Sequence, residues 1–333
     1  MASAETSAAD PAATADEYLV PANAKITPGF VDLYEDFAVE PDDWSDVATL
    51  TFTFSRPVRD PHLHVFGTGG SSGDVVNHDD YWPAIELVTG VPAKPTFSMA
   101  AGFPGYRVTA NAIEPEWVYL ADSTSCGIVY TCGTVKVSGT VQSFTIKMRA
   151  HDVQYGNGGT TPQLWAAFKL SLTEDDSDAP ASYGTASHAI SDSYVGRSVT
   201  ADHTDAVSLT PRTLPTDTDD DDAAVTISRV RTAAKGRTYT LAVPVKSGSP
   251  SSVSGWIDVD RNGRFDTGER ATARVAAGAK AAKLNWTFPQ PLRTGRTWIR
   301  IRLTAGSKAT TSATGWADSG EVEDHQVNVL PHT

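Results

Sequence analysis

Apolar and polar residues alternate with a period of two along most of the chain. The alternation is clear in "ATLTFTF" (48–54), "SFTIKMRAH" (143–151) and "TWIRIRLT" (297–304). Because successive side chains of a strand point to opposite faces, this period predicts strands with one buried face. Turn residues recur between such segments, and no long segment has the period of a helix. The pattern predicts an all-β fold.

The predicted strands fall into two blocks. Residues 18–173 predict a jelly-roll or lectin-like β-sandwich, and residues 225–330 predict an Ig-like β-sandwich. Residues 174–224 are polar and include the aspartate run 217–222, so we expect an irregular acidic linker there. Residues 1–17 are rich in Ala, Ser and Thr and predict a flexible leader without the features of a signal peptide.

The alternation also assigns faces within the second block. In "WIRIRL" (298–303) the three aliphatic residues share one face, which we expect in the core. Arg300 and Arg302 alternate with them. The sequence therefore places both guanidinium groups on the solvent face.

The segment "DVDRNGRFDTGE" (258–269) has the ligand spacing of a twelve-residue calcium loop. Such a loop needs oxygen donors at fixed positions and a glycine at the sharp turn, which is Gly263 here. Phe265 is expected to fix the loop to the core. The predicted ligands are Asp258, Asp260, Asn262, Arg264 through its carbonyl, Asp266 and Glu269.

Two interpretations of this loop stay open on sequence alone. Asp, Asn and Gly dominate turns, so the segment could be an Asx-rich hairpin turn without an ion. Alternatively it binds Ca²⁺, because several hard oxygen donors around a tight turn suit a cation of that size. With no helices to reopen, a bound calcium would be a structural clip and not a switch.

A second group of acids lies in "WADSGEVEDHQV" (316–327). It forms a second candidate cation site. Its members are Asp318, Glu321, Glu323 and Asp324.

The segment "GEVEDHQV" (320–327) resembles the signature of the GEVED domain, with His325 in place of the usual tyrosine. "GWIDVDRNGRFDTGE" (255–269) and "SDAPASYGTASHAISDSYVG" (177–196) are similar to further segments of that family. The resemblance covers about residues 175–330. It implies a β-sandwich module of bacterial secreted and surface proteins.

The first block has a resemblance of its own. "ATLTFTFSRPVRDPHLHVFGTGG" (48–70) is similar to a stretch of the lectin-like, non-repetitive domain of CshA-type fibrillar adhesins. The resemblance implies attachment to host matrix proteins. The chain lacks the long array of fibril repeats, so no full-length fibre is implied.

A candidate ligand site lies in "VVNHDDYWPAIEL" (75–87), in what we expect to be a loop. Aromatic faces beside polar oxygens suit a sugar, which stacks on one and hydrogen-bonds to the other. Alternatively, the two aromatic residues belong to the core. The candidate residues are Asn77, Asp79, Asp80, Tyr81 and Trp82.

The two cysteines, Cys126 and Cys132, lie six positions apart across an expected hairpin. A single close pair predicts a local disulfide and an oxidising, extracellular setting. Two free thiols are the alternative. A zinc site is not expected, since no further Cys or His lies at ligand spacing.

Charge is distributed unevenly along a chain whose net charge is −13. The first block is acidic, and Arg229 to Lys308 is basic. The contrast could dock two domains together or present a basic face to an anionic polymer. Nucleic-acid binding is not expected, because no recognition helix or aromatic RNA motif accompanies the basic residues. No apolar run of membrane-spanning length occurs.

Motifs for catalysis are missing: the sequence has no G-x-S-x-G, H-E-x-x-H or P-loop. His62 and His64 share one strand face and could bind a metal, but packed histidines are favoured without a third ligand. Glu114 and Glu116 could form a hydrolytic carboxylate pair, a minor alternative. We expect no enzyme.

The last four residues, Leu330, Pro331, His332 and Thr333, resemble the L-P-x-T part of a sortase signal. The resemblance implies attachment to the cell wall. A chance tetrapeptide is the alternative.

Together these features predict an extracellular, calcium-stabilised, adhesin-like binding protein. Its expected partner is a host or environmental matrix protein or glycan. The main alternative is the carbohydrate-binding accessory region of a secreted polysaccharide hydrolase, and an independent hydrolase is a third.

Overall fold

The structure is a computed structural model. It describes residues 3–7, 30–36, 43–68, 70–103, 105–116, 130–158, 163–206, 227, 229–231, 237–289, 292–306 and 310–330. These residues form strands and two short 3₁₀ turns, η1 (Ala181–Tyr183) and η2 (Thr267–Glu269), without an α-helix. The predicted all-β class is confirmed.

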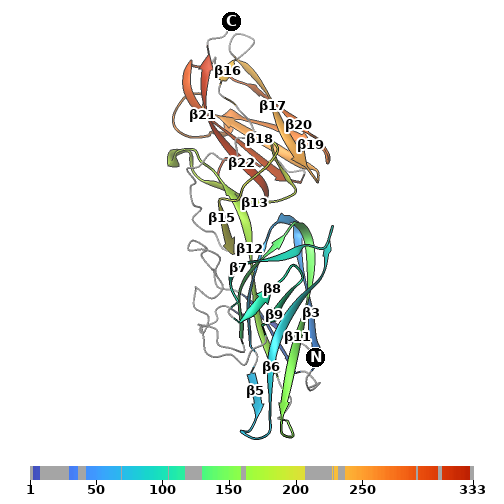
Figure 1. Cartoon of the computed structure of the whole chain (residues 1–333). Coiled ribbons are helices and arrows are strands. Elements are labelled where there is room, and N and C mark those ends of the chain that lie inside the picture. The colour runs from blue at the N-terminus through green and yellow to red at the C-terminus, as the bar shows by residue number, and fades with distance from the viewer. Residues whose placement is uncertain are drawn as a thin grey trace. The chain divides into compact units, whose positions relative to one another are not determined.

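The chain divides into two compact units (Figure 1). Unit 1 comprises Met1–Ser55, Arg59–Leu172 and Thr204–Leu209, and unit 2 comprises Arg56–Val58, Thr173–His203 and Thr210–Thr333. The division lies close to the expected end of the first block, residue 173.

Unit 1 contains two sheets. The first has the order β1 (Ser3–Ser7), β2 (Phe30–Asp36), β12 (Gln163–Asp176), β4 (His62–Thr68), β10 (Tyr130–Ser138) and β7 (Thr96–Gly102). The second has the order β3 (Trp44–Arg59), β11 (Thr140–Tyr155), β6 (His78–Val91), β9 (Ala112–Pro115) and β8 (Tyr106–Val108), with β5 (Gly70–Gly73) paired to β6. The short strand β15 spans His203–Ala206.

Aromatic rings join the two sheets of unit 1. Phe52 of β3 stacks on Phe144 of β11 at 4.9 Å between ring centroids, and meets Phe168 of β12 edge-on at 6.1 Å. Phe144 and Phe168 are buried. The alternation of the sequence thus places one face of each sheet in a shared core.

Unit 2 is a second pair of sheets. The larger has the order β19 (Arg270–Val275), β18 (Ser251–Ile257), β21 (Gly295–Ala305), β22 (Gly315–Leu330) and β13 (Ala186–Ile190), with β16 (Arg229–Arg231) also on β22. The smaller has the order β14 (Ser193–Val195), β17 (Thr238–Ser247) and β20 (Ala281–Thr287).

Close packing of these two sheets depends on Gly255 of β18. A Cβ atom at this position would lie 2.8 Å from side-chain atoms of both Leu284 and Trp286, which belong to β20. Both partners are buried in the core of unit 2. Only a residue without a side chain allows the sheets to come this near.

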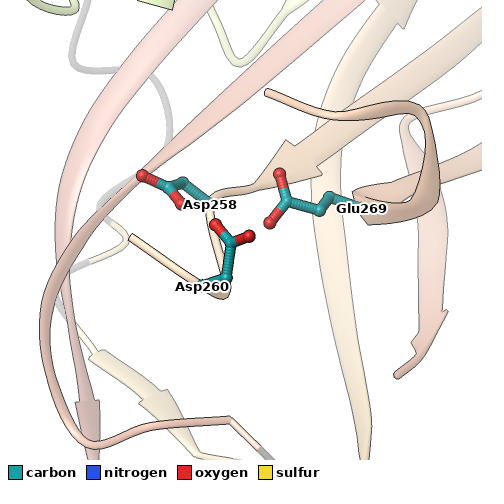
Figure 2. Close-up of side chains that lie close together, drawn as sticks. All are labelled: Asp258, Asp260 and Glu269. Atoms are coloured by element: carbon teal, nitrogen blue, oxygen red, sulfur yellow. The ribbon is translucent and has the colours of Figure 1, made fainter. Parts of the chain in front are cut away.

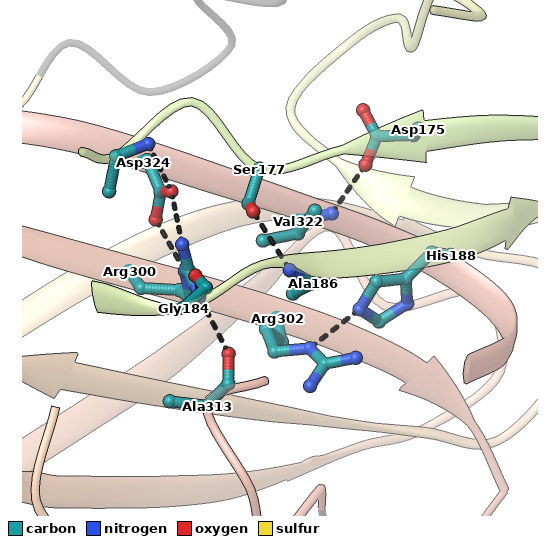
Figure 3. A network of polar contacts seen from close by, with 11 residues as sticks. Asp175, Ser177, Gly184, Ala186, His188, Arg300, Arg302, Ala313, Val322 and Asp324 are labelled. Atoms are coloured by element: carbon teal, nitrogen blue, oxygen red, sulfur yellow. Dashed lines mark hydrogen bonds and ion pairs between the residues drawn. The ribbon is translucent and has the colours of Figure 1, made fainter. Parts of the chain in front are cut away.

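The expectation that Arg300 and Arg302 face solvent is wrong, because both side chains are buried, at 0% and 1% exposure. Arg300 forms a two-point ion pair with Asp324, at 2.8 and 2.7 Å, and donates to the carbonyls of Gly184 and Ala313 (Figure 3). These acceptors compensate the charge in place of water.

The segment that covers these arginines is the one expected to be an irregular linker. Within 174–224, the structure instead has the end of β12, the turn η1, and the strands β13, β14 and β15. The described residues of 173–195 are mostly buried. Likewise, the expected leader contains β1, which pairs with β2. Residues 217–222 lie outside the described part of the chain.

His188 of β13 is fully buried beside Arg302. Its Nε2 accepts a hydrogen bond from Arg302 Nε at 2.8 Å, so its Nδ1 carries the proton and donates to the Ser319 carbonyl, also at 2.8 Å. Burial, with the charges of Arg302 and Arg300, holds the pKa of His188 well below its usual value of 6.5. The imidazole is therefore neutral in the folded protein.

This neutral histidine predicts acid sensitivity of unit 2. Below about pH 6.5 the unfolded chain binds a proton at His188 that the folded chain does not, so the free energy of unfolding falls as pH falls, by up to about 1.4 kcal/mol per pH unit. The midpoints of urea unfolding at pH 7.5 and 5.5 measure this loss of stability. The uncharged variant His188→Gln should lose less stability over this interval than the natural chain, and an equal loss in both would contradict the prediction.

Candidate metal centre

The predicted calcium loop connects β18 to β19 in unit 2. Its backbone turns sharply at Arg261 and Gly263, which have positive φ values of 61° and 79°. Glycine adopts this conformation without strain, which accounts for Gly263 at the sixth loop position. The loop ends in η2, whose last residue is Glu269.

Three carboxylates converge inside the loop, from Asp258, Asp260 and Glu269 (Figure 2). One oxygen atom from each lies within 4.8 Å of the others. Asp258 and Glu269 are buried, at 1% and 5% exposure, whereas Asp260 is exposed. Three negative groups held this close repel one another, and a cation between them would relieve the repulsion.

Backbone amides orient the two buried carboxylates. Glu269 accepts from the amides of Val259 (2.6 Å) and Asp266 (2.9 Å), the second bond belonging to a capping box on η2. Asp258 accepts from the amides of Asn262 (3.2 Å) and Gly263 (3.1 Å). A carboxylate has about four lone-pair sites, so both groups keep the capacity to bind an ion.

Burial raises the pKa of Glu269 to about 7, against the lowering effect of the Asp266 and Val259 amides. The charges of Asp258 and Asp260 raise it further. Among described residues, these three carboxylates accept only from amides and one hydroxyl, and none pairs with Lys or Arg. An all-oxygen, strongly negative donor set fits a hard cation such as Ca²⁺.

Two further predicted ligands, Asn262 and Asp266, bond to each other. Asn262 donates through Nδ2 to Asp260 (3.3 Å) and Asp266 (2.8 Å), and its oxygen accepts from the Arg264 amide (2.9 Å). Asp266 is therefore tied to Asn262 and stays outside the group of three. The backbone carbonyl of Arg264 stays a predicted ligand.

Sequence reasoning missed Tyr183, which lies in η1, far from the loop along the chain. Its hydroxyl donates to Asp258 at 2.7 Å, and burial followed by this bond raises the pKa of the phenol. Its ring lies 4.7 Å from that of Phe265, the residue expected to fix the loop to the core. The available signal was the "ASYG" segment within the GEVED resemblance.

The second candidate cation site does not form a group of three acids in the described residues. Asp324 is neutralised by Arg300, and Glu321 accepts from the Val195 amide. Glu323 lies 3.0 Å from the His325 ring, and Asp318 is exposed and accepts from the Ser319 hydroxyl at 3.1 Å. Each of these acids therefore has contacts of its own.

The loop, strand β22 and the segment that contains Tyr183 all belong to unit 2. Residues 252–328 match the GEVED domain family. The match includes the loop and β22 as far as residue 328. No curated protein and no solved structure matches the chain. The predicted GEVED resemblance is confirmed over residues 252–328, whereas its extension to residues 175–251 and the CshA-type resemblance stay predictions.

Outside the residues that match the GEVED family, the predicted ligand site at 77–82 is not a loop, because residues 78–82 begin strand β6. Side chains alternate along it, so Asp79 and Tyr81 are buried while Asp80 and Trp82 are partly exposed, as is Asn77. The five residues therefore do not share one surface. The alternative that Tyr81 is a core residue agrees with its burial.

The paired histidines of β4 are packed in unit 1, as favoured from the sequence. His64 is buried between the hydroxyls of Thr134 (2.8 Å) and Ser171 (2.6 Å). Burial, and then the charge of Lys136, lowers the pKa of His62 to about 4. Neither arrangement resembles a metal site. No helix in the described part of the chain is long and apolar enough to cross a membrane.

Cys126 lies outside the described residues, as does the side chain of Cys132. The disulfide thus stays a prediction, with a stabilisation of about 2 to 3 kcal/mol for so short a loop. We expect intact mass after alkylation of the denatured, unreduced protein to show no adduct. Reduction before alkylation should add two, and adducts without reduction would contradict the disulfide. Pro331, His332 and Thr333 also lie outside the described residues.

Proposed function

We propose that this chain is an extracellular, non-catalytic binding protein of the adhesin type, with a calcium ion that stabilises its GEVED domain. The convergence of Asp258, Asp260 and Glu269 carries the proposal. A loop of twelve residues with few apolar side chains gains rigidity from an ion that binds both of its ends.

Sequence features support the extracellular setting and the binding role. The close cysteine pair fits an oxidising compartment. The GEVED resemblance implies a secreted or surface module, and the CshA-type resemblance of the first block implies attachment. The L-P-x-T resemblance at residues 330–333 supports anchoring to a cell wall.

Calcium titration and surface binding test the proposal on the full chain. Isothermal titration should give one calcium per chain, with much weaker binding of magnesium, which demands a stricter octahedral geometry. The protein should then bind immobilised matrix proteins or glycans, with no release of reducing sugars. Binding to insoluble polysaccharides alone would favour the accessory region of a hydrolase, and no binding at all would refute the binding role.

A further inference from the structure

Unit 1 contains a cleft of about 810 Å³ on the sheet that includes β3, β11, β6, β9 and β8. The volume falls within the range of small-molecule sites in proteins. The apolar part of the lining includes Ile85 of β6 and Ala112 of β9, both buried. All lining residues belong to unit 1, and none belongs to the predicted 77–82 site.

One wall of the cleft presents an aromatic ring held in place from two sides. The Arg149 guanidinium lies 5.4 Å from the centre of the Trp44 ring, and the His151 ring meets Trp44 edge-on at 5.2 Å. Arg149 is itself held by Asp46, at 3.1 Å. An aromatic side chain fixed in advance loses little entropy when a ligand packs on it.

The other wall comes from the β8–β9 hairpin, where Arg107 and Glu114 face each other across the strands. Their charged groups pair at 3.2 Å. Glu86 and Asn111 add a further acceptor and an amide to the lining. The cleft therefore offers both donors and acceptors, and most of its charges already have partners of opposite sign.

This composition discriminates between classes of ligand. A phosphorylated or sulfated ligand would meet the carboxylates of Glu86, Glu114 and Glu116, and a cationic ligand would meet Arg107 and Arg149. An uncharged sugar is repelled by neither the carboxylates nor the arginines. Its hydroxyls donate to carboxylates and accept from guanidinium groups, and its apolar face packs on an aromatic ring.

We propose that this cleft binds an uncharged oligosaccharide, with Trp44 as the stacking residue and the Arg107–Glu114 pair as hydrogen-bonding partners. The proposal deepens the proposed binding function and rests on it. It places the ligand on the β3–β11–β6 face of unit 1, whereas the calcium loop belongs to unit 2.

A glycan array with the full chain in excess calcium tests the proposal. The probes are immobilised neutral oligosaccharides ending in glucose, galactose, mannose or N-acetylhexosamine, with sialylated and sulfated members for comparison. We expect binding to neutral members. Binding to charged members alone, or to no glycan while matrix proteins are bound, would overturn the cleft proposal and leave the proposed function standing.

Variants locate the site. Trp44→Ala should weaken binding to the neutral probe about tenfold or more, because an aromatic contact is lost. The matched control Trp316→Ala changes the same residue type in unit 2, where Trp316 is 48% exposed, and should bind like the natural chain. An equal loss of binding in both variants would overturn the proposal.

Arg107→Ala keeps the test valid if the Trp44 variant misfolds. The Arg107 side chain is 63% exposed, so its loss leaves the core intact. It should weaken binding several-fold with an unchanged melting curve. Unchanged binding by both Trp44→Ala and Arg107→Ala would exclude the cleft as the site.

Discussion

Replacing Arg300 by alanine should destabilise unit 2 by about 3–5 kcal/mol. The variant leaves Asp324 buried with the Ala179 amide (2.8 Å) but without its counter-charge, and it leaves the carbonyls of Gly184 and Ala313 without their donor. For a unit of this size the melting temperature should fall by roughly 10 °C. Differential scanning calorimetry of the full chain resolves the two units if they melt separately.

Arg296→Ala is the matched control, because Arg296 is exposed on the same strand, β21. Its effect should stay within about 0.5 kcal/mol. The double variant Arg300→Met with Asp324→Leu should recover part of the lost stability, since an apolar pair carries no desolvation cost but leaves the carbonyls of Gly184 and Ala313 without a donor. Equal melting of Arg300→Ala and Arg296→Ala would show that the buried ion pair does not stabilise unit 2.

Removal of calcium should produce the second large effect. An ion present at about 100 times its dissociation constant stabilises the folded state by about 2.7 kcal/mol, so a chelator should lower the melting temperature of unit 2 by several degrees. Unit 1 should melt unchanged. Identical melting with chelator and with excess calcium would exclude the structural role of the ion.

Asp260→Ala removes a ligand of the ion without breaking a buried contact of the fold, because Asp260 is exposed. Asp258 is less suitable, since it also accepts a hydrogen bond from Tyr183. This variant should melt at the same temperature with and without calcium. Asp318→Ala removes an exposed aspartate of the same unit outside the loop, and should keep the calcium dependence. Loss of the dependence in both variants would point to a general charge effect.

The strands and the acid loop could be predicted from local sequence, because both depend on spacing alone. The burial of Arg300 and Arg302 could not. Two of their partners, the Gly184 carbonyl and His188, come from a segment whose Ser, Asp and His residues look solvated. The others, including Asp324, lie on β22 or just before it, and the register of β21 and β22 brings them close. Tyr183 was missed for the same reason, since its contact with Asp258 joins residues distant in the chain. At 78–82 the turn-forming residues suggested a loop, but pairing with β11 keeps them extended.

One edge of β22 is shared by two short strands, with β13 along its first residues and β16 along its last. Between them the Val322 amide donates to the Asp175 carboxylate at 2.6 Å (Figure 3). A side chain thus fills a place where a backbone amide would otherwise invite another strand. At high local concentration an unpaired strand edge can pair with the same edge of another copy, and an acid at this gap opposes the growth of a continuous intermolecular sheet.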